Sequence, residues 1–378
     1  MIRKIADNII SPLGLTSEEN FKAILSGRSE LYPRPGAFDL PEDFCGSLID
    51  RKIIEEIFDQ TANQHGYSFF EKLCILSATK AIESVGIDPT NNDTIFVLSS
   101  TKGNVDQLEE NLLSETCYVA RSAEAIAKHF GNGNTPVVAS NACISGVCAQ
   151  IAAVRLLLAG RYKTAIVIGS DALSKFIISG FQSFKALSPE QCKPYDAKRV
   201  GLNLGEATGC LILTSDDNIC PQADWHYLGS SIHNDANHIS GPSRTGEGSY
   251  RVLMDILKNV QPQELAFVNA HGTATAYNDE MESIAIHRAG LDKVSVNGLK
   301  GFYGHTLGAA GVIETILSMK AVDNGVILPT RGYEEQGTTY KLNISNQARE
   351  TDKRAFIKIL SGFGGSNAGI AYEKGGNA

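Results

Sequence analysis

The pattern of hydrophobic and polar residues along the chain predicts alternating strands and helices. Short apolar runs of strand length recur between glycine, proline and polar residues. They predict strands over residues 94–98, 135–139, 164–168, 209–213, 265–269, 293–296 and 355–360. Longer segments predict helices over residues 71–85, 144–158, 248–259, 279–288 and 308–324. This alternation indicates an α/β fold.

Two further segments refine this picture. Residues 357–372 read as a β-hairpin, with a glycine-rich turn between two apolar runs. The alternating pattern is interrupted at residues 216–221, where polar residues and a proline follow one another. That interruption predicts an N-terminal half, residues 1–218, and a C-terminal half, residues 219–378.

Composition and charge argue against several classes of function and location. The chain of 378 residues is long enough for two cores, and its formal charge of -8 argues against nucleic acid as a partner. No apolar run approaches the roughly 18 residues of a membrane span. The N-terminus lacks the apolar core of a signal peptide, so a cytoplasmic location is expected. The eight cysteines form no C-x-x-C pair, which predicts reduced thiols, no metal site and no cofactor.

Cys143 is the first candidate for chemistry. It lies where the strand predicted over residues 135–139 passes into the helix predicted over residues 144–158. Free N–H groups and the helix macrodipole at such a junction are expected to stabilise a thiolate. A buried structural cysteine is the alternative for an isolated thiol.

Two histidines occur in unusual settings in the second half. His271 follows an apolar strand and precedes a glycine, whereas His305 lies in a glycine-rich loop that opens a helix. A lone histidine is more often a packed or a surface residue than a catalyst. Two histidines flanked by glycines, which allow close approach of backbone and substrate, are hard to explain by packing.

These residues belong to a series of motifs that resembles the elongating β-ketoacyl-acyl-carrier-protein synthases of the thiolase superfamily. The motifs stand in the family's order and span nearly the whole chain, from Ile-Ser-Pro-Leu-Gly (10–14) onwards. They are NACISG (141–146), PYDAKRVGLNLGEATG (194–209), NDANHISGPSRTGEG (234–248), AHGTATAYNDEMES (270–283), LKGFYGHTLGAAGVIE (299–314) and SGFGGSN (361–367).

The resemblance implies a thiolase-like fold of five layers, αβαβα, built from two pseudo-symmetric halves. It also implies a decarboxylative Claisen condensation between an acyl group held on Cys143 and malonyl-acyl carrier protein, which gives β-ketoacyl-acyl carrier protein and CO2. His271 and His305 would stabilise the enolate, because the family's decarboxylating elongation enzymes carry two histidines. The implied partners are an acyl carrier protein and either an identical subunit or a ketosynthase-like one.

The resemblance gives roles to the remaining candidates. Lys300 would orient the site and be held by Glu314. Phe363 would act as a gating aromatic, and its N–H would form an oxyanion hole with that of Cys143. Thr273 and Thr275 alternate along the chain, so their hydroxyls can face one way and bind the phosphopantetheine arm. The alternatives are a solvated lysine, a core aromatic and two threonines of a β-prone segment.

The chain departs from the family's pattern in three places. The segment between Lys102 and Ala120 is short, Glu190 and Gln191 stand where the family often has a carrier-docking arginine, and Ser361 replaces a common aromatic. The pathway therefore stays open between fatty-acid synthesis and specialised polyene or polyketide synthesis, and the short segment favours the specialised one. A non-catalytic chain-length subunit and a coenzyme A-dependent acyltransferase or thiolase are the competing functions.

Overall fold

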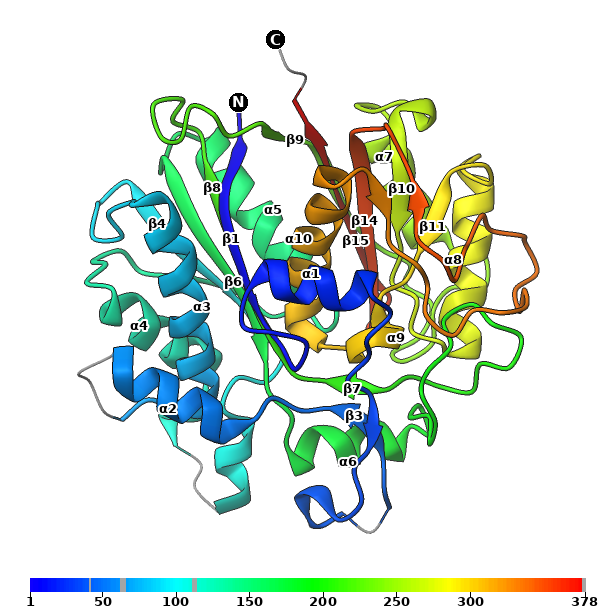
Figure 1. Cartoon of the computed structure of the whole chain (residues 1–378), viewed down its shortest axis with the longest axis horizontal. Coiled ribbons are helices and arrows are strands. Elements are labelled where there is room, and N and C mark those ends of the chain that lie inside the picture. The colour runs from blue at the N-terminus through cyan, green and yellow to red at the C-terminus, as the bar shows by residue number, and fades with distance from the viewer. Residues whose placement is uncertain (41, 62–65, 111–113, 376–378) are drawn as a thin grey trace.

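The computed structural model describes residues 1–40, 42–61, 66–110 and 114–375. Within these ranges one ten-stranded sheet runs through the molecule, and its two ends curve towards each other around a pair of helices (Figure 1). One half of the sheet consists of β1 (Arg3–Ile10), β4 (Thr94–Ser99), β5 (Val137–Ala139), β6 (Thr164–Asp171) and β8 (Ala207–Thr214). The other consists of β9 (Trp225–Asn234), β10 (Leu265–Asn269), β11 (Ser295–Asn297), β14 (Ala355–Gly362) and β15 (Ser366–Lys374).

The two halves repeat one topology. From the centre outwards the first half has the order β1-β8-β6-β4-β5, and the second has β9-β15-β14-β10-β11. If the five strands of each half are numbered along the chain, both orders read 1-5-4-2-3. The pairings agree as well, because in each half the three outer strands are parallel and the two inner pairings are antiparallel. The halves join through a short antiparallel contact between β1 and β9.

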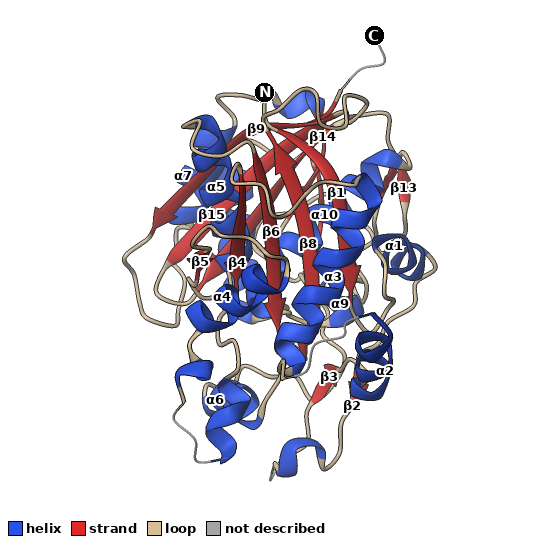
Figure 2. Ribbon diagram, turned by 90° about the vertical axis from the view of Figure 1, so that its left-hand side faces the viewer, coloured by secondary structure: helices blue, strands red, loops and turns tan. Residues whose placement is uncertain are grey.

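Helices form three layers around the two half-sheets. The main helices are α1 (Ser17–Leu25), α2 (Arg51–Thr61), α3 (Phe69–Val85), α4 (Val119–His129), α5 (Ser145–Leu158), α6 (Lys175–Ser183), α7 (Glu247–Ile256), α8 (Ala276–Arg288), α9 (Lys300–Tyr303) and α10 (Ala310–Asp323). The α3 and α4 helices cover the outer face of the first half, as Figure 2 shows, and α7 and α8 cover that of the second. The α5 and α10 helices are buried between the halves. The expected five-layer αβαβα architecture is therefore confirmed.

The central helices cross at two glycines. A Cβ atom on Gly146 would lie 2.9 Å from the carbonyl oxygen of Gly308, and one on Gly311 would lie 2.4 Å from the amide nitrogen of Val147. Only glycine permits this approach, since both contacts are made by backbone atoms. The crossing holds the N-terminal ends of α5 and α10 together, where Cys143 and His305 lie.

The predicted elements are found with small shifts at their ends, and β10 matches the predicted range in full. The hairpin of β14 and β15 is also present. The prediction did not include β1, whose sequence RKIADNII contains several polar residues. Those residues are satisfied internally: Lys4 pairs with Asp7, and Asn8 donates to Ser77. Burial of paired polar groups conceals a strand from a hydrophobicity pattern.

The prediction also omitted β9, α1, α2, α4 and α6. The described residues also contain two small sheets. One consists of β2 (Tyr32–Pro33), β3 (Cys45–Ser47) and β7 (Leu204–Gly205), and the other consists of β12 (Val326–Ile327) and β13 (Arg349–Glu350). The short segment between Lys102 and Ala120 contains 3-10 turns at Val105–Glu110 and Glu115–Cys117, and its residues 111–113 lie outside the described ranges. The predicted boundary at 218/219 falls in the connection between β8 and β9.

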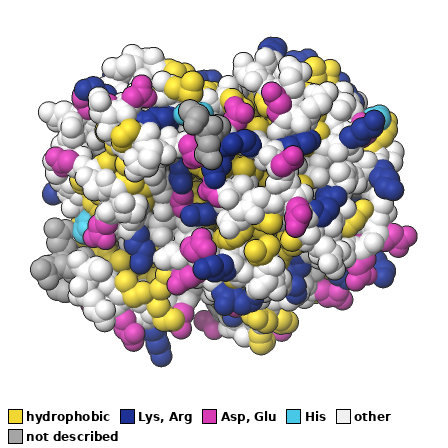
Figure 3. All heavy atoms as spheres, turned by 45° about the horizontal axis from the view of Figure 1, so that its top comes forward, with side chains coloured by type: hydrophobic (Ala, Val, Ile, Leu, Met, Phe, Trp, Pro, Cys, Tyr) yellow, Lys and Arg dark blue, Asp and Glu magenta, His cyan; other side chains and the backbone are white. Residues whose placement is uncertain are grey.

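On the face shown in Figure 3, Lys and Arg side chains are interspersed with Asp and Glu, and no large patch of that face carries a single sign of charge. Among the helices that the structure describes, none combines the length and the apolar character needed to cross a bilayer.

Candidate active site

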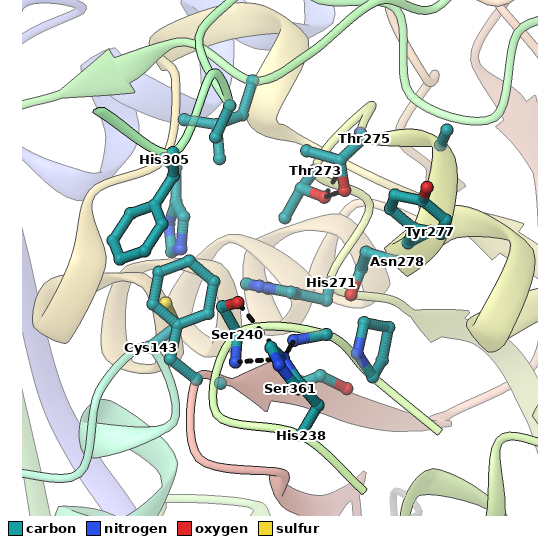
Figure 4. Close-up of a pocket in the computed structure, with 18 of the residues that line it drawn as sticks. Cys143, His238, Ser240, His271, Thr273, Thr275, Tyr277, Asn278, His305 and Ser361 are labelled. Atoms are coloured by element: carbon teal, nitrogen blue, oxygen red, sulfur yellow. Dashed lines mark hydrogen bonds between the residues drawn. The ribbon is translucent and has the colours of Figure 1, made fainter. Parts of the chain in front are cut away.

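A cavity of about 480 Å3 contains the candidate residues from both halves. Cys143 lies just before α5, His271 follows β10, and His305 precedes α10. One nitrogen of each histidine and the sulfur of Cys143 all lie within 4.8 Å of one another. Figure 4 shows these three side chains converging on one end of the cavity. A single reacting group can therefore contact all three.

Cys143 occupies a tight turn between β5 and α5. Ala142 has a φ of 44°, in the left-handed region, and the amide of Ser145 donates back to its carbonyl. This turn directs the thiol into the cavity, where 8% of the residue stays exposed. The glycine-rich turn after β14 lies opposite, since a Cβ on Gly362 would be 3.2 Å from the amide nitrogen of Cys143. That turn and the thiol line the same cavity.

The expected stabilisation of a thiolate is wrong for this conformation. Burial raises the pKa of Cys143 to about 11, and the nearby charge of Lys300 offsets only part of that rise. The helix begins at Ser145, two residues beyond the thiol, and Ser145 and Val147 donate their amides to backbone carbonyls. Loss of hydration therefore outweighs the favourable charges around the sulfur.

The two imidazoles lie edge to face, with ring centroids 4.9 Å apart. Both are buried, and burial lowers the pKa of each well below the usual value, assisted by the positive charge of Lys300. Both rings are therefore neutral at pH 7. Nδ1 of His305 accepts the amide of Leu307 at 3.2 Å, which places the proton of the neutral ring on Nε2. That Nε2 is buried and has no hydrogen-bond partner among the residues that the structure describes, and the same holds for Nδ1 of His271.

Lys300 connects the histidine to a buried acid. Its Nζ donates to the carbonyl oxygen of His271 at 2.6 Å and contacts Oε1 of Glu314 at 2.8 Å. Both side chains are about 1% exposed. The backbone of His271 is fixed further by Glu282, which accepts the amides of His271 at 2.6 Å and Gly272 at 2.8 Å.

The other predicted site residues line the same cavity. The hydroxyls of Thr273 and Thr275 lie 2.9 Å apart and so face the same way. Phe363 is 38% exposed at the mouth, where its ring stacks on Phe181 and meets the edge of Phe184. Ser361, which donates to Asn367, adds a polar group to the wall. The structure thus brings the candidates together, and their roles stay predictions.

Sequence reasoning missed Lys358 on β14. It is fully buried, contacts Glu314, and donates to the carbonyl oxygen of Ala270 at 3.0 Å. The available signal was a single lysine inside the apolar run Ala-Phe-Ile-Lys-Ile-Leu. A charge in the middle of a strand with two buried faces needs a buried partner.

A second missed group is Asp171, at the end of β6. It accepts the amides of Thr101 and Gly308 and the hydroxyl of Ser100. Because Gly308 follows closely after His305, this carboxylate fixes the loop that carries the second histidine.

Cys143, His271 and His305 are also close enough to ligate one metal ion. The thiol would first have to lose its proton, which burial opposes. The neutral donor pair and the buried thiol suit acyl transfer and enolate stabilisation directly.

Comparison with known proteins agrees with this geometry. Residues 5–218 match the model "Beta-ketoacyl synthase, N-terminal domain", and residues 226–334 match "Beta-ketoacyl synthase, C-terminal domain". A 3-oxoacyl-[acyl-carrier-protein] synthase 2 of Vibrio harveyi is 25% identical over 97% of this chain and 96% of its own. Nodulation protein E of Rhizobium leguminosarum bv. trifolii is 31% identical, and the match covers 62% of this chain and 60% of that relative's length.

The same fold occurs in a ketosynthase solved in complex with its chain length factor from Xenorhabdus doucetiae. The TM-score is 0.85 at 22% identity, with 99% of this chain and 98% of that one covered. The two matched ranges include all three residues that converge in the cavity. By these matches the chain is a member of the beta-ketoacyl synthase family.

Proposed function

We propose that the protein catalyses the decarboxylative Claisen condensation of an acyl group on Cys143 with malonyl-acyl carrier protein. The observation that carries this proposal is the convergence of one thiol and two neutral imidazoles within 4.8 Å in a single cavity. The reaction needs a nucleophile that accepts an acyl group, and hydrogen-bond donors that stabilise an enolate beside it.

In the first step the sulfur of Cys143 attacks the thioester carbonyl of an acyl-carrier. The new carbon–sulfur bond forms as the carrier's bond breaks, and the proton of Cys143 ends on the carrier thiol. The amides of Cys143 and Phe363 are the proposed donors to the oxyanion. Proximity of Gly362 to the amide of Cys143 supports this assignment.

In the second step a malonyl-carrier loses CO2, and the electron pair of the broken bond forms an enolate. The imidazoles of His271 and His305 are the proposed donors to the enolate oxygen. The enolate carbon then attacks the acyl carbonyl, the carbon–sulfur bond to Cys143 breaks, and the thiol recovers a proton. The unpartnered Nε2–H of His305 supports this role, because a buried donor without a partner is expensive unless substrate fills it.

The surrounding residues are proposed to position the substrates. Thr273 and Thr275 would bind the amides of the phosphopantetheine arm, supported by their adjacent hydroxyls. Phe363 would swing aside to admit the acyl group, and its exposed position at the mouth supports that motion. Lys300, held by Glu314, would keep His271 in place.

The partners are proposed to be an acyl carrier protein and a second subunit, either identical or ketosynthase-like. The chain length factor bound to the solved ketosynthase is one precedent for the second kind. Between fatty-acid and specialised synthesis we favour a specialised pathway, supported by the short segment between Lys102 and Ala120. A cytoplasmic location and a boundary at residues 218/219 complete the proposal.

Intact-protein mass spectrometry tests this function. The enzyme is mixed with acyl-carriers of several lengths and then with malonyl-carrier. We expect an acyl adduct on Cys143 that disappears as β-ketoacyl-carrier and CO2 form. Failure to load any primer, alone or with a second ketosynthase-like chain, would contradict the proposal and favour a non-catalytic subunit. Loading without CO2 release would favour an acyltransferase.

Three variants assign the steps. Cys143→Ala should keep the fold, since a smaller side chain fits the same turn, but abolish the acyl adduct. His271→Ala and His305→Ala should still load acyl groups and should lose condensation by about a hundredfold or more. Loss of loading in both histidine variants would instead make them activators of the thiol.

A further inference from the structure

We infer that Lys358 is a second positioning residue for the condensation, holding the backbone in front of His271 and balancing the buried charges behind both imidazoles. This inference rests on the proposed function. Lys358 lies three residues before the SGFGGSN motif but outside it, and no step described above uses it.

The contacts of Lys358 parallel those of Lys300. Lys358 donates to the carbonyl oxygen of Ala270, and Lys300 donates to the next carbonyl oxygen, that of His271. Both ammonium groups contact Glu314, one at each carboxylate oxygen. Two consecutive carbonyls that lead into the catalytic turn are therefore held by two cations on one acid. The cations come from different elements, Lys300 from α9 and Lys358 from β14.

Lys358 supplies one of the positive charges of this cluster, together with Lys300 and with Arg199, whose Nε lies 3.9 Å from Asp279. Two buried lysines oppose two buried glutamates, Glu314 on α10 and Glu282 on α8. Asp279 lies beside Glu282, and burial raises its pKa to about 7. Without Lys358 the cluster behind His271 would carry one positive charge less. That loss would disfavour the enolate that forms on the other side of the imidazoles.

Electrostatics links Lys358 to both histidines. Its positive charge contributes to lowering the pKa of His271 and of His305, and so helps to keep both rings neutral. Burial in turn lowers the pKa of Lys358 to about 8, although Glu314 counteracts this effect. The groups that face Lys358 are Glu314, Lys300, Glu282 and the two imidazoles. Lys358 is therefore placed to lose its proton just above neutral pH.

This arrangement has a distinct kinetic signature. Above about pH 8 a growing share of Lys358 is neutral, the cluster gains net negative charge, and decarboxylation should slow with one-proton dependence. Acyl loading should instead keep rising with pH, because it depends on ionisation of Cys143. Removing the positive charge also raises the pKa of both imidazoles, so their protonation begins at higher pH.

The experiment measures CO2 release from malonyl-carrier and acyl loading from pH 5.5 to 9.5. The wild-type enzyme is compared with Lys358→Met, and with Lys353→Met as a control in the exposed segment before β14. In Lys358→Met we expect CO2 release to fall about tenfold or more. Its decrease above about pH 8, the alkaline limb of the rate profile, should disappear. Its decrease at low pH, the acid limb caused by protonation of the imidazoles, should move to higher pH. Loading and the control variant should stay within about twofold of the wild type.

Two results would overturn the inference. One is a wild-type rate of CO2 release that does not decrease above about pH 8. This result can be obtained even if Lys358→Met fails to fold. The other is a folded Lys358→Met whose loading and decarboxylation fall equally while both limbs stay in place, as expected for a structural residue. A wild-type enzyme that loads acyl groups but releases no CO2 would contradict the proposed function instead.

Discussion

The thiol of Cys143 lies in surroundings that oppose its ionisation. With a pKa of about 11, only about one thiol in ten thousand is a thiolate at pH 7. Lys300 is the strongest favourable charge, yet it is shared with Glu314. A buried, protonated thiol is protected from adventitious oxidation, since the thiolate is the reactive species. Acyl loading must therefore proceed through this small thiolate fraction and depend on a well-positioned acyl thioester.

Alkylation of Cys143 by iodoacetamide should follow from this ionisation. Below pH 10 the rate constant should rise close to tenfold for each pH unit, because the thiolate fraction does so when the pKa is about 11. Lys300→Met should slow alkylation at every pH, since it removes the main charge that lowers the pKa. Mass spectrometry of the peptide containing Cys143 measures the rate. A rate constant that is flat between pH 6 and 9 would contradict this prediction.

At the scale of elements, the α5–α10 crossing brings the two halves of the site together. Cys143 comes from one half of the molecule and His305 from the other, and each lies just before one of the crossing helices. Their mutual distance therefore depends on how closely the helices approach at Gly146 and Gly311. A backbone contact of this kind cannot relax through a side-chain rotation.

Gly311→Ala should destabilise the protein and impair the site. The added methyl would stand 2.4 Å from the amide nitrogen of Val147, so the helices must separate. We expect a loss of about 2 kcal/mol in the free energy of unfolding, measured by urea denaturation, in spite of alanine's better helix propensity. Gly180→Ala is the matched control, because Gly180 lies in α6 and no described residue is within 4 Å of its added methyl. That variant should be neutral or more stable by up to about 1 kcal/mol. Equal losses in both variants would exclude the crossing as the cause.

The sequence predicted those elements whose patterns reflect burial directly, such as β10 and α5. It could not predict β1, because the polar residues of that strand are paired only in the folded chain, Lys4 with Asp7 on the same strand and Asn8 with Ser77, 69 residues away. Motifs identified Cys143, His271 and His305, since each stands at an element end and both histidines adjoin a glycine. Lys358 was missed for the same reason as β1: its partner Glu314 is 44 residues away. The raised pKa of Cys143 could not be predicted either, because the burial that causes it exists only in the assembled fold.

At the scale of the whole molecule, net charge and local surface have opposite effects on the proposed partner. The chain carries a formal charge of -8 and should repel an acidic carrier protein at long range. The mouth of the cavity differs from this average. Phe184, Val200 and Tyr277 are more than half exposed there, and Lys185 lies beside them. By contrast, the guanidinium of Arg199 donates to the carbonyl oxygens of Asp196 and Gly337.

Lys185 should therefore guide the acyl-carrier to the site. Lys185→Glu is expected to raise KM for acyl-carrier about tenfold at low ionic strength, with little change in kcat, because the charge acts on the encounter and not on the chemistry. Raising salt to about 0.5 M should shrink the difference, since screening shortens the reach of both charges. Lys353→Glu, the same charge change at the far end of β14, is the control and should leave KM within about twofold. A small acyl thioester without a carrier should load equally well into all three proteins. If Lys185→Glu slowed that reaction too, the lysine would act within the cavity rather than on the approach of the carrier.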